Sequence, residues 1–120
     1  MPRRNKMGTR YILDGHMPVE EPDIAKWKHW YEKADRIVRR SGATVKINGR
    51  PVGIVTVSTV FIGLDHSFGG GEPVLFETMV FGGPLDGEMD RCSTWEGAEK
   101  MHELMCERVK RGEDANQTRE

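Results

Sequence analysis

The chain has 120 residues, of which 37% are hydrophobic and 31% are charged, and 18 Lys and Arg against 19 Asp and Glu leave a net charge of −1. This length suits one domain with one hydrophobic core. The near-zero net charge disfavours a general nucleic-acid binder. The longest apolar run is far shorter than a membrane-spanning helix, and the basic N-terminus lacks the apolar segment of a secretory signal. We therefore expect a cytoplasmic protein with no membrane partner.

Both ends of the chain are polar. We expect residues 1–10 to form a flexible N-terminus, residues 11–111 to form a single α+β domain, and residues 112–120 to form a disordered tail. The segment Tyr11-Ile-Leu13 reads as a short strand or an extended arm that ends at the Asp14-Gly15 turn.

A helix is expected over residues 22–40. Pro22 suits the first turn, basic residues gather in the second half, and Gly42 follows as a C-terminal signal. Apolar residues recur at spacings of three and four, as on one face of a helix. This stripe comprises Ile24, Trp27, Tyr31, Ala34 and Val38.

A β-hairpin is expected next, because Asn48-Gly49 is a strong signal for a type I′ turn. Residues 44–47 and 51–54 form its two arms. Pro51 favours a position at the sheet edge, since proline has no N–H to donate to a ladder.

Two apolar, β-branched runs, residues 54–64 and 74–82, flank a glycine-rich loop and predict an antiparallel pair of strands. Folding the chain symmetrically about the loop sets Thr59 near Thr78. Neither face of this pair is polar, whereas a half-exposed antiparallel sheet should alternate apolar and polar residues. We expect two helices to cover one face and a second copy of the chain to cover the other, which predicts a homodimer through the sheet.

A turn at residues 82–87 and a short strand at residues 88–92 lead to a second helix. Ser93 followed by Glu96 matches a capping box, and an amphipathic stripe then continues to a stop at Gly112. The expected architecture is α+β: an antiparallel sheet of four to five strands packed with two helices. The aromatic residues at helical spacing are read as core, and so is His102.

The stretch from Asp65 to Gly71 is the strongest candidate for chemistry. His66 could act as a general acid or base, with Asp65 orienting it. The backbone amides of Gly69, Gly70 and Gly71 could approach a phosphate. The loop lacks both the lysine of a P-loop and the glycine order of a dinucleotide fingerprint. The alternative is a hairpin loop that needs glycine for positive φ, with the histidine merely exposed.

Glu77 lies in a strand that otherwise favours burial, so it is a catalytic or ligand-binding candidate. The alternative is an edge position or an ion pair with an arginine such as Arg91. Thr59 and Thr78 belong to a hydroxyl ladder that could contact a ligand, although packing explains them too. His16 could join the site if the N-terminal arm folds over the sheet.

The two cysteines, Cys92 and Cys106, have neither a CxxC spacing nor a nearby pair of histidines. They are read as free thiols. The sequence also lacks metal-binding motifs and carboxylate clusters, so we predict no metal and no cofactor.

Three stretches of the chain resemble a family of small proteins encoded by bacteriophages and prophages. The resemblance covers most of residues 11–110 and implies the cytoplasm of an infected bacterial host as the setting. It implies no activity for individual residues. The stretches are Tyr11-Ile-Leu-Asp-Gly-His16 with the Trp-rich segment after it, Val57-Ser-Thr-Val-Phe-Ile-Gly-Leu-Asp-His66 with Leu75-Phe-Glu-Thr-Met-Val-Phe-Gly-Gly83, and Ser93-Thr-Trp-Glu with His102.

By analogy of context, this setting favours an anti-defence protein that binds a nucleotide-derived immune signal, either a cyclic oligonucleotide or an ADP-ribose derivative. Such a protein would sequester or cleave the signal. The loop glycines, the threonines, Arg50 and Arg91 would hold phosphate or ribose. In the cleaving version, a metal-independent phosphodiesterase, His66 would protonate the leaving oxygen and Glu77 or Asp65 would activate the nucleophile.

The alternative hypothesis is a protein-interaction module or adaptor of phage origin without small-molecule activity. A deep pocket lined by His66 and Glu77 would oppose this alternative. A flat interaction surface would support it.

Overall fold

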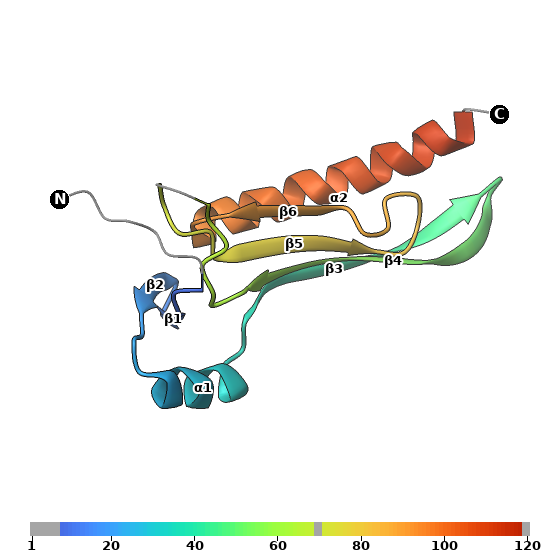
Figure 1. Ribbon diagram of the computed structural model, residues 1–120. Coiled ribbons are helices and arrows are strands. Elements are labelled where there is room, and N and C mark those ends of the chain that lie inside the picture. Colours follow the sequence, from blue (N-terminus) through green and yellow to red (C-terminus); the bar gives the residue numbers. More distant parts are fainter. Residues whose placement is uncertain (1–7, 69–70, 119–120) are drawn as a thin grey trace.

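The computed structural model describes residues 8–68 and 71–118. Four antiparallel strands form the main sheet in the order β3-β4-β5-β6, and β1 and β2 form a separate hairpin. Helix α2 crosses one face of the main sheet, whereas α1 lies toward the end where the β1–β2 hairpin is found (Figure 1). The fold is therefore α+β, as predicted. The elements are β1 (Tyr11–Asp14), β2 (Met17–Glu20), α1 (Ile24–Lys33), β3 (Ile37–Ile47), β4 (Arg50–Phe61), β5 (Phe76–Phe81), β6 (Met89–Cys92) and α2 (Trp95–Thr118).

The central strands β4 and β5 pair in the register that the sequence predicts. Thr59 lies opposite Thr78, and Val60 lies opposite Glu77. Because side chains alternate along a strand, this register decides which residues face α2, and a slip by one residue would exchange the two faces.

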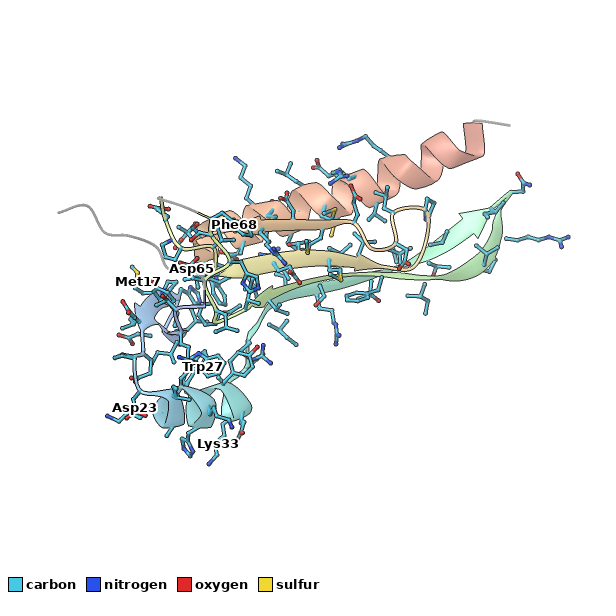
Figure 2. All side chains as sticks on the ribbon, in the orientation of Figure 1. Met17, Asp23, Trp27, Lys33, Asp65 and Phe68 are labelled. Atoms are coloured by element: carbon cyan, nitrogen blue, oxygen red, sulfur yellow. The ribbon has the colours of Figure 1, made fainter. Side chains whose placement is uncertain are left out.

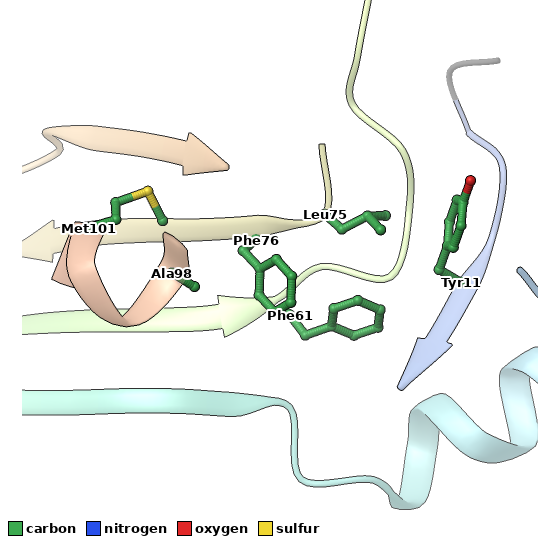
Figure 3. Close-up of a cluster of buried hydrophobic side chains, with 6 residues drawn as sticks. All are labelled: Tyr11, Phe61, Leu75, Phe76, Ala98 and Met101. Atoms are coloured by element: carbon green, nitrogen blue, oxygen red, sulfur yellow. The ribbon is translucent and has the colours of Figure 1, made fainter. Parts of the chain in front are cut away.

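Two clusters of buried side chains lie between the sheet and α2. In the first, the rings of Phe61 and Phe76 meet edge to face with centroids 5.3 Å apart. Figure 3 shows Tyr11 of β1 approaching this cluster from one side and Ala98 and Met101 of α2 from the other. Replacing a buried phenylalanine with alanine costs about 3–5 kcal/mol. The second cluster extends the core along α2 with Val45, Val55, Val57, Val80, Met105 and Val109.

The β3–β4 hairpin is confirmed, and its strands are longer than predicted. Asn48 and Gly49 both adopt positive φ, at 52° and 79°, which is the requirement of a type I′ turn. Strand β3 is one of the two edge strands of the sheet, and Pro51 lies in β4 opposite Lys46, outside the part of β4 that pairs with β5.

The first helix is much shorter than the predicted range of 22–40. It ends at Lys33, and β3 occupies the region where its second half was expected. At the change of direction, the Asp35 carboxylate accepts a hydrogen bond of 3.0 Å from the first amide of β3, and the Arg36 carbonyl accepts one of 2.8 Å from the Phe61 amide. The β-branched residues that follow fit a strand as well as a helix, and pairing with β4 selects the strand.

The N-terminal region is more ordered than predicted. Residues 17–20 form β2, a strand that the sequence did not predict, directly before the expected helix. Residues 8–10 are not a loose end, because the Gly8 amide donates to the Asp65 carbonyl at 2.9 Å and Arg10 forms a bridge to Leu64. Backbone pairing to the β4–β5 loop therefore holds the part of the N-terminus that the structure describes.

Helix α2 differs from the prediction at both ends. Thr94 caps it rather than Ser93, since the Thr94 hydroxyl accepts a hydrogen bond of 3.0 Å from the amide of the third helical residue. At the other end the helix passes Gly112 and continues to Thr118, so the expected disordered tail is helical that far. A Cβ on Gly112 would lie 3.2 Å from Leu85 Cγ. This glycine permits close packing instead of ending the helix.

Within the described residues, a helix covers only one face of the main sheet. Helix α2 packs on all four strands, but the expectation that both helices share this task is wrong. The Trp27 Nε1 of α1 donates to the Tyr11 carbonyl at 3.0 Å, and Trp30 meets Phe61 edge-on at 5.8 Å. Helix α1 therefore ties β1 to the end of the sheet. The uncovered face, here called the open face, exposes large apolar side chains, namely Ile37, Val52, Ile54, Phe81 and Met89.

A small polar network lies within the core. His102 of α2 is buried, with Nδ1 2.8 Å from the Thr59 hydroxyl and Nε2 2.8 Å from the Ser41 hydroxyl. The Thr59 hydroxyl also lies 2.5 Å from that of Thr78. Both nitrogens of a neutral ring are thereby satisfied, as buried polar groups require. His102 is a core histidine.

We predict that His102 makes the protein less stable in mild acid. Burial lowers the pKa of His102, Arg39 lowers it further, and Glu103 acts in the opposite direction. The unfolded chain then binds a proton that the native chain resists. The stability contribution is complete above about pH 6.5 and is lost as the pH falls from there through the lower folded pKa.

Urea unfolding between pH 7.5 and pH 5 measures this dependence. His102→Gln should flatten the slope of unfolding free energy against pH. His29→Gln is the matched control because His29 is exposed on α1, and it should keep the wild-type slope. Three identical slopes would contradict the prediction.

Candidate functional site

The loop between β4 and β5 carries Asp65 and His66, and Asp65 holds this loop in shape. Its Oδ1 accepts hydrogen bonds from the amides of Ser67, at 2.8 Å, and Val74, at 3.0 Å. The residue is only 1% exposed, and its Oδ2 has no hydrogen-bond partner in the part of the chain that the structure describes. Asp65 and Phe68 lie at the same end of the molecule as the β1–β2 hairpin (Figure 2). The Asp65 carboxylate closes the loop.

His66 is half-buried in the same loop, and its Nδ1 lies 2.7 Å from the Leu64 carbonyl oxygen. A carbonyl only accepts, so the proton of the neutral ring is on Nδ1 and Nε2 is the acceptor. This tautomer suits a general base. Gly71 adopts a φ of 112°, in line with the loop's expected need for glycine. Gly69 and Gly70 lie outside the described residues.

Glu77 forms the ion pair that the sequence offered as an alternative. It lies opposite Arg91 in the β5–β6 ladder, and its Oε2 accepts from Nε at 3.1 Å and Nη2 at 3.0 Å of that arginine. The two side chains are 19% and 34% exposed, so the pair is worth at most about 1 kcal/mol. Among the described residues, no hydrogen bond or ion pair joins Glu77 to His66.

The remaining predicted ligand-binding residues do not gather at the loop. Thr59 and Thr78 are fully buried beneath α2, and their hydroxyls belong to the His102 network. Arg50 lies at the far tip of the β3–β4 hairpin (Figure 1). From Arg50 to Phe61, β4 spans about 36 Å at roughly 3.3 Å per residue.

His16 lines a pocket, and its ring contacts Trp95, a neighbour that the sequence did not predict. Its ring stacks on Trp95, with centroids 3.8 Å apart and planes within 4°, so the β1–β2 turn packs on the start of α2. A pocket of about 280 Å³ lies beside this stack and is also lined by Asp14, Met17 and Glu96. Helical spacing identified Trp95 only as a core residue, because contacts between distant segments leave no periodic signal.

Cys92 and Cys106 are both free thiols in the structure. Burial raises the pKa of the Cys92 thiol, the hydrogen bond to the Thr94 carbonyl lowers it, and Asp90 raises it. A thiol with a raised pKa stays protonated at neutral pH and is a weak nucleophile. Cys106 lines an apolar pocket of about 240 Å³ between α2 and β3.

Across residues 8–68 and 71–118, no three His, Cys, Asp or Glu side chains are placed to bind a metal ion together. No helix in that part is long and apolar enough to cross a membrane. Comparison with protein-family models, curated proteins and solved structures finds no match for this chain. Function is therefore inferred from its own geometry.

We predict that Asp65 and Ser67 differ sharply in their effect on stability. Asp65→Ala removes two charge-assisted hydrogen bonds to backbone amides and should lower the unfolding free energy by about 2–3 kcal/mol. Ser67→Ala removes a buried hydroxyl that has no partner among the described residues, so it should change stability by less than about 0.5 kcal/mol. Urea unfolding followed by tryptophan fluorescence compares them, and equal effects would exclude the loop-closing role.

Proposed function

We propose that the chain is a protein-interaction module of phage origin that acts as a homodimer, with the open faces of two copies in contact. The observation that supports this function is the exposed apolar side of the main sheet. The setting would be the cytoplasm of an infected bacterial host, which is what the phage resemblance implies.

The open face is more apolar than a sheet that faces water. Ile54 is 71% exposed and Phe81 is 50% exposed, although strands that face water carry polar residues at alternate positions. Strands β3 and β4 extend for about 30 Å along residues 52–60, but β5 and β6 have only six and four residues, so the four strands together present about 450 Å². Two such faces would bury about 900 Å², close to the roughly 1,000 Å² of a specific interface and in the range of a weak dimer.

The polar groups of the open face are compatible with contact between two copies. Glu77 and Arg91 neutralise each other. Arg40, opposite Ser58 on the edge strand, lies near the rim, where its charge can stay in water. Sheets that pack face to face stand about 10 Å apart, which leaves room for one layer of side chains from each copy.

The carboxylates of Asp65 and Glu77 already have structural partners, which favours a protein-interaction function over catalysis. Asp65 uses one oxygen to hold two backbone amides, and Glu77 is bound to Arg91. Three pockets lined by described residues lie beside the β1–β2 hairpin and between α2 and the β3–β4 hairpin, and neither His66 nor Glu77 lines any of these three. A flat apolar surface is what the interaction hypothesis requires.

Ile54→Lys should separate the dimer, because it places an unpaired charge in the middle of an apolar contact. We expect wild-type chain at 100 µM to elute with twice its mass of 13.6 kDa. The variant should have a dissociation constant at least about 100-fold higher, since an uncompensated buried charge costs about 3–5 kcal/mol. Size-exclusion chromatography with light scattering measures both.

Leu104→Lys is the matched control for this experiment. Leu104 is 49% exposed on α2, on the other side of the sheet from the open face (Figure 1), so the same change of chemistry there should leave the dimer intact. A wild-type chain that remains monomeric at 100 µM would overturn the homodimer.

Binding of a nucleotide-derived immune signal is the second candidate, and one observation favours it. The contact of His66 Nδ1 with the Leu64 carbonyl presents Nε2 as a proton acceptor next to a glycine-rich loop. A loop that holds a cyclic oligonucleotide or an ADP-ribose derivative would make the chain an anti-defence protein that sequesters its ligand. Proton transfer by His66 would make it a metal-independent phosphodiesterase.

Incubation with cyclic di- and trinucleotides and ADP-ribose derivatives tests the second candidate. Ligand that disappears from solution and returns intact after denaturation indicates sequestration, and converted ligand indicates cleavage. In the cleaving case His66→Ala should reduce turnover by about 100-fold or more, while His29→Ala should not. Compounds that all remain free and unchanged would exclude this candidate.

A further inference from the structure

Two adjoining pockets form one depression between the β1–β2 hairpin and the start of α2, here called the arm groove. One pocket, of about 280 Å³, lies beside His16 and Trp95. The other, of about 220 Å³, lies over Tyr11 and Leu75. Met17 contributes to the lining of both. Their combined volume is in the range of ligand-binding sites.

The floor of the arm groove is apolar and firmly held. Tyr11 and Leu75 are buried members of the first core cluster. Trp95 packs edge-on against the ring of Phe76, with centroids 6.3 Å apart. Met17 projects at the rim with 66% of its surface exposed (Figure 2). A groove built on core residues keeps its shape before a ligand arrives, which lowers the entropy cost of binding.

The lining of the arm groove is negatively charged. Asp14 and Glu96 line the first pocket and Glu72 lines the second, whereas no lysine or arginine lines either one. None of the three carboxylates forms an ion pair within the described part of the chain. The N-terminus of α2 offsets about half a charge beside Glu96. A surplus of about two negative charges remains over an apolar floor.

We propose that the arm groove binds an extended basic segment of a partner protein. An apolar side chain of that segment would lie on Leu75 and Trp95. Its lysine or arginine side chains would meet Asp14 and Glu96 at one end of the groove and Glu72 at the other. Charge complementarity of this kind selects partners and repels phosphate-bearing ligands. The arm groove shares no residue with the open face, so this site goes beyond the proposed dimer and is independent of it.

The probe is a fluorescein-labelled hexapeptide that alternates leucine with lysine, and its counterpart carries glutamate in place of lysine. Anisotropy with the full chain should show binding of the lysine peptide alone. Glu72→Gln and Glu96→Gln should each weaken it about two- to fivefold, and both together with Asp14→Asn should reduce it to the level of the glutamate peptide. In ¹H–¹⁵N spectra the Trp95 indole signal should shift while that of Trp30 stays in place.

Glu32→Gln is the matched control, because Glu32 is an exposed carboxylate on α1 outside the groove. Equal binding of both peptides, or equal losses in Glu32→Gln and Glu96→Gln, would overturn the proposal. So would tighter binding after Arg3, Arg4 and Lys6 are changed to glutamine, since the chain's own basic N-terminus would then be the occupant. Ile54→Lys should bind the peptide normally, which separates this test from the test of the dimer.

Discussion

The hydrogen-bonded ladder between β4 and β5 sets the position of almost everything else in this molecule. Its register brings the hydroxyls of Thr59 and Thr78 together and turns Phe61 and Phe76 toward α2. His102 then binds the Thr59 hydroxyl from the helix. A slip by one residue would send these hydroxyls to the opposite face and leave a buried imidazole without a partner, which is costly. The polar network therefore favours one register in a core that apolar packing alone would specify less sharply.

The main sheet has two apolar faces, but only one of them is covered by a helix of the described chain. Helix α2 extends along the sheet, and residues of α2 contribute to both buried clusters on this side. Helix α1 is occupied elsewhere, because Trp27 binds the backbone of β1 and Trp30 packs at the end of the sheet. The second apolar face consequently has no cover from the described chain, and contact with another copy is the simplest way to remove it from water.

The end of the sheet near the β1–β2 hairpin has a different character. There the β4–β5 loop, held by Asp65, meets residues 8–10 through backbone pairing, and the hairpin turn rests on α2 through the stack of His16 on Trp95. Acidic side chains surround a preformed apolar groove at this end. The molecule thus carries two surfaces of contrasting chemistry, the exposed apolar open face and the acidic arm groove, and the proposed adaptor would use both.

The sequence by itself determined the features that depend on local pattern. Folding the chain symmetrically about the glycine-rich loop predicted the β4–β5 register, and Asn48-Gly49 predicted the β3–β4 hairpin, because a type I′ turn admits few other residues. The two apolar faces of the sheet and the amphipathic helix α2 could also be predicted from the sequence. Each of these features is a property of neighbouring residues.

The tertiary structure decided what depends on distant partners. Residues 37–40 belong to a strand because β4 pairs with them, although their spacing also fits the end of a helix. Glu77 forms an ion pair with Arg91, and Asp65 accepts hydrogen bonds from backbone amides. The ring of His16 stacks on Trp95. No periodicity encodes such pairings, since the groups lie close only after the chain has folded. The sequence therefore identified the polar residues worth examining, and the fold assigned each of them its contacts.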